Sequence, residues 1–179
     1  MDEKDVFFAP GTGQYVKNYG DVAGVDIWLG HSEISPDATC FIGHSLGAHF
    51  LLDTMPDPLK RFIFINPLIK KRNIVSLFVR WIRFLLSEGR TMKKIVPVSL
   101  WPNNIKTIFR LLKTDALEQL QKIPAENITV IRGIYDAYFC TEEDVALLRE
   151  RNISVREVSA GHDWNENINN AVMDILRTK

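Results

Sequence analysis

The sequence has 179 residues, of which 46% are hydrophobic and 25% are charged, and its 22 basic residues balance 22 acidic ones. This is the composition of an ordinary globular protein, and the length predicts a single domain, residues 1–179, with a core of its own. No apolar run reaches the ~18 residues of a membrane-spanning helix, and two cysteines, Cys40 and Cys140, are too few for a disulfide framework.

A short apolar run near the N-terminus, Val6 to Ala9, predicts the first strand. It ends in Pro10-Gly11-Thr12-Gly13, a glycine-rich turn that brings backbone N–H groups into the open. A dinucleotide-binding loop would need a third glycine where Val16 stands. We therefore interpret this turn as one half of an oxyanion hole, with a plain turn after a strand as the alternative.

Two further elements are expected before residue 39. They are a short helix over Gln14–Tyr19 and a second strand over Val25–Leu29. Only nine residues, 30–38, would then join that strand to the next one, whereas a parallel crossover normally needs a dozen or more. Either the connection is reduced to a loop, or the predicted boundaries are wrong by a few residues.

The central motif is Gly43-His44-Ser45-Leu46-Gly47, a G-x-S-x-G. The apolar and β-branched residues 39–42 predict the end of a buried strand, and residues 46–55 predict a helix. The serine therefore lies on a strand-to-helix turn, where glycines two residues to either side let the strand and the helix pass close together. This context predicts a nucleophile elbow, with Ser45 Oγ above the carboxyl edge of a sheet.

A basic insertion follows the next predicted strand, Arg61 to Ile65. Residues 66–113 hold 11 of the 22 basic residues and one of the 22 acidic ones, which leaves 11 basic and 21 acidic residues elsewhere. Such asymmetry is typical of a distinct module. Helices are predicted at residues 74–86, at residues 103–113 and from a capping box at Asp115 to Pro124. Residues 68–123 are therefore predicted to form a helical lid, unless their apolar side chains only pack on the sheet.

The last third of the chain alternates strand and helix again. Strands are predicted at residues 128–132 and 153–158, with a helix capped by Thr141 and Asp144 between them and a final helix after Gly161-His162-Asp163. This alternation predicts an α/β fold, with a mostly parallel sheet of about six strands covered by helices on both faces.

Three predicted strand ends carry the residues that a serine nucleophile needs. A serine hydroxyl reacts poorly at neutral pH without a base within hydrogen-bond reach and an acid behind that base. Ser45, Asp136 and His162 each follow a predicted strand, and reactive groups gather at the carboxyl ends of parallel strands. Asp163 and Glu157 are near His162 in the sequence and remain alternatives for the acid.

The sequence resembles the α/β-hydrolase superfamily over most of its length. The segments that carry the resemblance are FFAPGTG, CFIGHSLGAHF, VIRGIYDAY and SAGHDW. The resemblance implies a catalytic triad of Ser45, Asp136 and His162, and an oxyanion hole formed by the backbone N–H groups of Thr12 and Leu46. This member of the fold would lack the usual first two strands, and its turn reads Ala-Pro-Gly instead of the common His-Gly.

Two functions of different classes are therefore hypotheses. The first is a serine hydrolase that cleaves carboxylic esters, or thioesters or amides, through an acyl-enzyme on Ser45, with a lid that selects apolar acyl chains. The second is an inactive member of the fold that binds a ligand, a partner or a membrane surface through its basic insertion.

The expected partners are a small ester or acyl substrate and, weakly, a membrane surface in contact with the basic lid. No cofactor, metal or nucleic acid is expected from the sequence, and the oligomeric state is left open. Residues 1–5 carry acids without the pattern of a secretory signal, which predicts a cytoplasmic location.

Overall fold

The computed structural model describes residues 5–88 and 96–178 of the chain. One parallel sheet of five strands runs through these residues, in the order β1-β2-β3-β4-β5. The inner strands are almost entirely buried, because helices cover both faces of the sheet. The strands are β1 (Val6–Ala9), β2 (Cys40–His44), β3 (Arg61–Ile65), β4 (Ile128–Gly133) and β5 (Ser154–Val158).

The strand expected over Val25–Leu29 is wrong. Gly24 forms a single β-bridge with Phe8, and a 3₁₀ helix, Ile27–Leu29, follows. Val25, Ile27 and Trp28 are buried against the core although they do not pair as a strand, so their apolar pattern reflects burial in a 3₁₀ helix and its approach. Because β1 pairs directly with β2, residues 10–39 join the two strands, and this length satisfies a parallel crossover.

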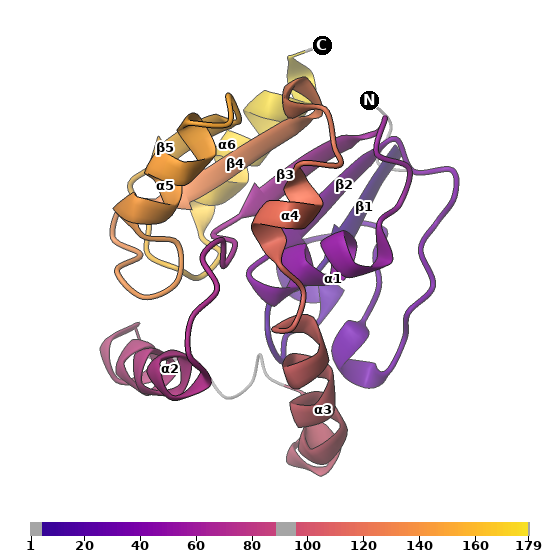
Figure 1. The fold of residues 1–179 in the computed structure, drawn as a ribbon. Helices are drawn as coiled ribbons and strands as arrows, with labels where there is room; N and C mark the ends of the chain where they lie inside the picture. Colours follow the sequence, from indigo (N-terminus) through magenta and orange to yellow (C-terminus); the bar gives the residue numbers. More distant parts are fainter. Residues whose placement is uncertain (1–4, 89–95, 179) are drawn as a thin grey trace.

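The order of the strands explains which helices cover each face of the sheet. Successive strands step in one direction across the sheet, and right-handed crossovers then place their helices on one face. That face carries α1 (Leu46–Thr54), α4 (Ala116–Leu120) and α5 (Glu142–Arg149) (Figure 1). The opposite face is covered by α6 (Glu166–Arg177), which follows the last strand, and by the 3₁₀ helix Val16–Tyr19.

Alternate side chains of the inner strands point into two separate cores. The core on the α1 side contains the aromatic side chains of β2 and β3, namely Phe41, Phe62 and Phe64. The core on the α6 side contains the aliphatic side chains between them, Ile42, Ile63 and Ile65. Because side chains alternate between the two faces along each strand, the sheet packs against a layer of helices on either side.

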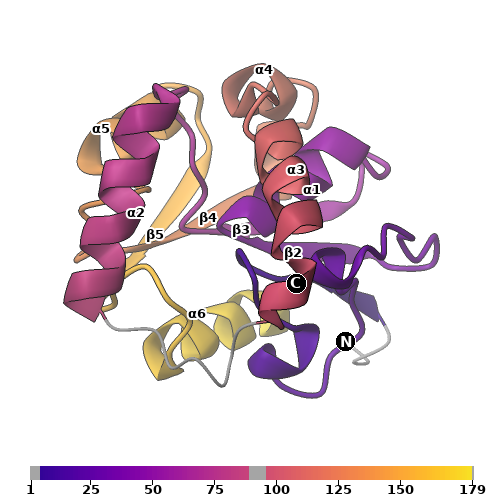
Figure 2. The same ribbon diagram turned by 90° about the horizontal axis from the view of Figure 1, so that it is seen from below.

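Two helices of the insertion lie beyond the carboxyl ends of the strands. They are α2 (Ile74–Glu88), below α5, and α3 (Trp101–Leu111), below α1 (Figures 1 and 2). The third helix, α4, packs on the sheet, where Ala116 and Leu120 are part of the main core. Residues 89–95 of the predicted lid lie outside the described residues.

The start expected for α3, at Asn103, is wrong by two residues. The helix begins at Trp101 and takes Pro102 into its first turn, where a missing N–H group costs no hydrogen bond. Within the described ranges, 5–88 and 96–178, we find no helix with the length and apolar character needed to cross a bilayer.

Candidate active site

Ser45 lies between β2 and α1 in a strained backbone conformation, with φ of 53° and ψ of −120°. A Cβ atom on Gly47 would lie 2.1 Å from the carbonyl oxygen of Ala9, and one on Gly43 would lie 2.6 Å from the Cα of Ala48. Both distances are too short for any side chain, so the close approach of strand, helix and neighbouring strand requires these two glycines. This geometry is that of a nucleophile elbow.

The three residues that the sequence singled out are hydrogen-bonded to one another. Nε2 of His162 lies 2.9 Å from Oγ of Ser45, and Nδ1 of the same ring lies 2.7 Å from Oδ2 of Asp136. The carboxylate only accepts, so Nδ1 carries a hydrogen, and Nε2 can accept the hydrogen of the serine hydroxyl whenever it carries no hydrogen of its own. The structure therefore brings together three groups that are 117 and 26 residues apart in sequence.

The backbone after β4 fixes the carboxylate of Asp136, which is completely buried. Oδ1 accepts from the N–H groups of Tyr138 and Phe139, both at 3.0 Å, and Oδ2 accepts from the N–H of Cys140 at 3.1 Å. Burial raises the pKa of Asp136, but the charge and hydrogen bond of His162 and the backbone N–H groups outweigh it and hold the pKa below its ordinary value. The carboxylate is therefore ionised at neutral pH.

The two alternative acids are engaged elsewhere. Glu157 binds Arg132 at 2.6 Å and Arg149 at 2.8 Å, and these hydrogen bonds lower the pKa of Glu157. Oδ1 of Asp163 lies 3.4 Å from Nε2 of Gln14. Asp136 is thus the carboxylate that contacts the imidazole in this structure.

Aromatic side chains enclose the imidazole. The ring of His162 packs against Phe139 and against Phe84 of α2, with ring centroids 4.4 Å and 5.3 Å apart. His162 is 1% exposed and Ser45 is 5% exposed, so both residues are screened from water. Since Phe84 belongs to the predicted lid, the insertion supplies part of the wall of the site.

The predicted oxyanion donors, Thr12 and Leu46, lie beside the elbow. Leu46 is the first residue of α1, where backbone N–H groups have no partner inside the helix. Thr12 is in a tight turn that is closed by a 3.0 Å hydrogen bond from the N–H of Gln14 to the carbonyl of Gly11. The N–H of Val96, in the middle of the insertion, donates to the carbonyl of Gly13 at 2.8 Å and joins the lid to this turn. The role of both donors in binding an oxyanion stays a prediction.

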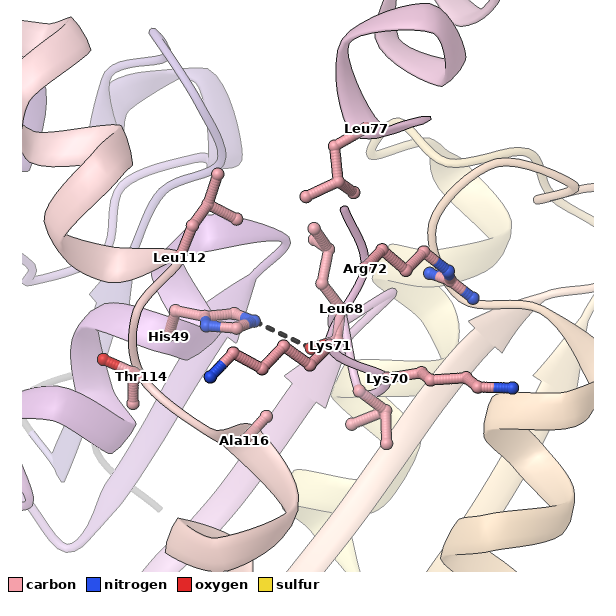
Figure 3. Close-up of a pocket in the computed structure, with 10 residues that line it drawn as sticks. His49, Leu68, Lys70, Lys71, Arg72, Leu77, Leu112, Thr114 and Ala116 are labelled. Carbon is pink, nitrogen blue, oxygen red and sulfur yellow. Dashed lines mark hydrogen bonds between the residues drawn. The ribbon is translucent and has the colours of Figure 1, made fainter. Parts of the chain in front are cut away.

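His49 is another buried histidine, and it lies away from these residues. Nε2 of His49, on α1, is 2.8 Å from the carbonyl oxygen of Leu68 (Figure 3). Its Nδ1 is 3.2 Å from the carbonyl oxygen of Leu111. Burial lowers the pKa of His49 by more than its hydrogen bonds and the nearby carboxylates of Asp53 and Asp115 raise it, so the ring is neutral. The adjoining cavity, about 20 Å³, has room for one water molecule and none for a substrate.

Other reactive side chains give no second centre in the part of the chain that the structure describes. No three His, Cys, Asp or Glu side chains are grouped there as metal ligands. Burial raises the pKa of Cys40 to about 11 and that of Cys140 well above its ordinary value. Both thiols are therefore protonated and inert at neutral pH.

Solved structures with a similar fold share little sequence with this chain. A lipase-esterase related protein from Clostridium acetobutylicum is 12% identical, with a TM-score of 0.62 over 96% of this chain and 92% of that one. A monoacylglycerol lipase from Paleococcus ferrophilus is 15% identical, with a TM-score of 0.51 over 96% and 93% of the two chains. An N-formylmaleamic acid deformylase from Pseudomonas putida is 14% identical, with a TM-score of 0.51 over 93% and 90%.

This chain has the α/β-hydrolase fold.

No protein-family model matches the chain, and a comparison with curated proteins found no relative. The α/β-hydrolase fold was expected from the sequence, and its five strands fit the expectation that the usual first strands are lacking. At these identities the likeness shows the fold alone, and a fold does not determine an activity, which depends on the residues of the site.

Sequence reasoning missed Asn66 as part of the site in this α/β-hydrolase fold. Its Nδ2 donates to the carbonyl oxygens of Gly161 and His162 at 3.0 Å and 2.8 Å, and its Oδ1 accepts from the N–H of Gly133 at 2.8 Å. Asn66 has φ of 44°, in the left-handed region that asparagine tolerates better than most residues. Its place directly after a buried strand and before Pro67 is the signal that could have identified it.

Proposed function

We propose that the protein is a serine hydrolase that cleaves carboxylic esters through an acyl-enzyme on Ser45. One observation carries this proposal: Ser45, His162 and Asp136 form a continuous hydrogen-bonded chain at 2.9 Å and 2.7 Å. Its order is nucleophile, base and orienting acid, and its base is screened from water. Thioesters and amides would react by the same steps.

The reaction proceeds by two acyl transfers. Ser45 Oγ attacks the ester carbonyl carbon while Nε2 of His162 takes the hydroxyl proton, and the N–H groups of Thr12 and Leu46 bind the oxyanion. The C–O bond to the alcohol then breaks, and Nε2 returns the proton to the leaving alkoxide oxygen. Water next gives a proton to Nε2 and attacks the acyl carbon. The bond between the acyl carbon and Oγ then breaks, Nε2 returns the proton to Oγ, and the acid leaves. Asp136 stabilises the imidazolium in both halves.

The substrate that fits the insertion has an apolar acyl chain. Phe84 packs on the catalytic imidazole from α2, so this helix lies against the site. Its outer side exposes a stripe of large apolar side chains, which would cover an acyl chain and lose contact with water on binding. The stripe consists of Ile74, Val75, Phe78, Val79, Ile82 and Leu86.

Weak contact with an anionic membrane surface is the second part of this proposal. The apolar stripe of α2 is accompanied by exposed cations, including Lys71 and Arg83, and such a combination suits the interface of an anionic bilayer. We expect the protein to sediment with phosphatidylglycerol vesicles, and less so at high salt. Equal sedimentation with neutral phosphatidylcholine vesicles, or none with either, would contradict this part.

A fluorophosphonate probe tests the hydrolase itself, because it phosphonylates only an activated serine. We expect the wild-type protein to be labelled and Ser45→Ala to remain unlabelled at equal concentration. Absence of labelling in the folded wild-type protein would instead support an inactive member of the fold that only binds a ligand. Equal labelling of both proteins would exclude Ser45 as the nucleophile.

A further inference from the structure

A second hydrogen-bonded chain lies behind the triad, built from buried groups with no part in the reaction steps. The hydroxyl of Tyr19 accepts from the N–H of Gly11 at 2.9 Å and lies 2.7 Å from Nδ1 of His44. Oε1 of Gln14 and Nδ1 of His44 compete for its single hydrogen. Nε2 of His44 lies 2.9 Å from the carbonyl oxygen of His162.

The direction of the last hydrogen bond is fixed by chemistry. A carbonyl oxygen only accepts, so Nε2 of His44 carries a hydrogen and donates it to the backbone of His162. The same carbonyl accepts from Nδ2 of Asn66 at 2.8 Å. Two buried side chains, from β2 and from the end of β3, thus hold the backbone that carries the catalytic imidazole.

The other end of this chain reaches the oxyanion turn. Tyr19 holds the N–H of Gly11, the residue before Thr12, and Gln14 closes the same turn. The ring of His44 packs directly under the turn, since a Cβ atom on Gly11 would lie 2.7 Å from its Nδ1. The turn and the backbone of His162 are therefore connected through two side chains, although they belong to opposite ends of the sequence.

We propose that Tyr19 and His44 are positioning residues that hold the oxyanion turn at a fixed distance from His162. This inference rests on the proposed hydrolase function of the same site. The oxyanion exists only during the reaction, so a loosened turn costs transition-state stabilisation and leaves binding of the ester almost unchanged. Buried residues that only support the fold would affect stability and leave the balance of kcat and KM alone.

The first test is Tyr19→Phe, which removes the hydroxyl and keeps the ring that packs against Phe8 and Trp164. We expect kcat for a nitrophenyl ester to fall about tenfold with KM unchanged, because a small misplacement of the turn acts on the transition state. Tyr135→Phe is the matched control, since its hydroxyl is on an exposed side chain, and kcat should stay at the wild-type value.

The second test separates the donor at His44 from its bulk. His44→Gln retains an N–H donor that can reach the carbonyl of His162, whereas His44→Leu retains only volume. We expect the leucine variant to lose about tenfold or more in kcat, and the glutamine variant to recover most of that loss.

Three outcomes would overturn the inference. One is that kcat of Tyr19→Phe and His44→Leu stays within about twofold of wild type, and another is that KM and the melting temperature change as much as kcat. The third is that the fluorophosphonate labels Tyr19→Phe at the wild-type rate, in which case the hydrolase proposal survives alone. If the probe fails to label the wild-type protein, both proposals fail together.

Discussion

The carboxyl edge of the sheet and the outer helices of the insertion hold their side chains in different ways. At the sheet edge, Asp136 and His162 are 0% and 1% exposed, and backbone groups of neighbouring loops bind the carboxylate. On α2, Phe84 is buried against the site, but Phe78 is 58% exposed and Leu86 is 82% exposed. Hydrogen bonds hold the Asp136 and His162 side chains of the first region, and the second presents apolar surface to solvent.

This difference assigns separate tasks to the two regions. Reacting groups need positions fixed to within a fraction of an ångström, which buried strand ends and their hydrogen bonds provide. An exposed apolar helix face is stabilised only when another group covers it and removes its side chains from water. We therefore expect changes at the sheet edge to alter the rate constant of the reaction, and changes on α2 to alter which esters react.

The largest effect is expected from removal of the nucleophile or the base. Ser45→Ala and His162→Ala should each lower kcat by ~10⁴ to 10⁶, and the double variant should lose scarcely more, because these residues act as one unit. The measurement is nitrophenyl ester hydrolysis, with circular dichroism to show that the fold is kept. Full activity in His162→Ala would refute the triad.

The next effect tests which carboxylate orients the imidazole. Asp136→Asn should keep the fold and lower kcat by ~10⁴, because the amide would hold the ring in the wrong tautomer. Glu157→Gln, which removes the charge that Arg132 and Arg149 bind, is the control and should retain the wild-type rate. If Asp136→Asn stayed active while Glu157→Gln or Asp163→Asn did not, the acid would be misassigned and the hydrolase proposal would stand.

The elements that the sequence predicted well are those whose signal is local. The elbow glycines, the capping box of Thr141 with Asp144 and the cap of Asp115 on the N–H of Glu118 all involve residues within five positions of one another. All are present in the structure, and so is β3 at its predicted bounds.

The elements that the sequence did not predict depend on distant contacts. Val25–Leu29 has the composition of a strand, but it packs against the core and ends in a 3₁₀ helix, and no local pattern distinguishes the two. His44 contacts the backbone of a residue 118 positions away, and Asn66 contacts the same carbonyl. Such polar links follow from the assembled sheet. Only the position of Asn66 at a strand end left a signal of its link in the sequence, whereas nothing local marked that of His44.

A smaller effect is expected on α2. Phe78→Ser with Ile82→Ser should lower kcat/KM for nitrophenyl octanoate about tenfold and leave nitrophenyl acetate unchanged, because in our proposal the stripe covers an acyl chain and acetate has none to cover. Leu59→Ser, at an exposed apolar position before β3, is the control. Equal rates of the wild-type protein on acetate and octanoate would show that the insertion does not select acyl chains.

The smallest effect concerns His49, which joins the two regions. The side chain comes from α1, and its two ring nitrogens face the carbonyls of Leu68, before α2, and Leu111, at the end of α3. At pH 7.5, His49→Gln should lower the free energy of unfolding by ~1 kcal/mol, the value of one lost hydrogen bond. The measurement is urea unfolding of both proteins.

The pH dependence of that difference has a definite sign. The folded-state pKa of His49 lies below its ordinary value of 6.5, so the unfolded chain binds more protons once the pH falls below that value. The wild-type protein therefore loses stability as the pH falls from 6.5 towards the lower folded-state pKa, while His49→Gln has no such proton to bind. The difference between the two proteins should narrow from pH 7.5 to pH 5.5. If the stability difference widened instead, a charged His49 would be donating to both carbonyls. The segments at Leu68 and Leu111 would then be held together more strongly at low pH.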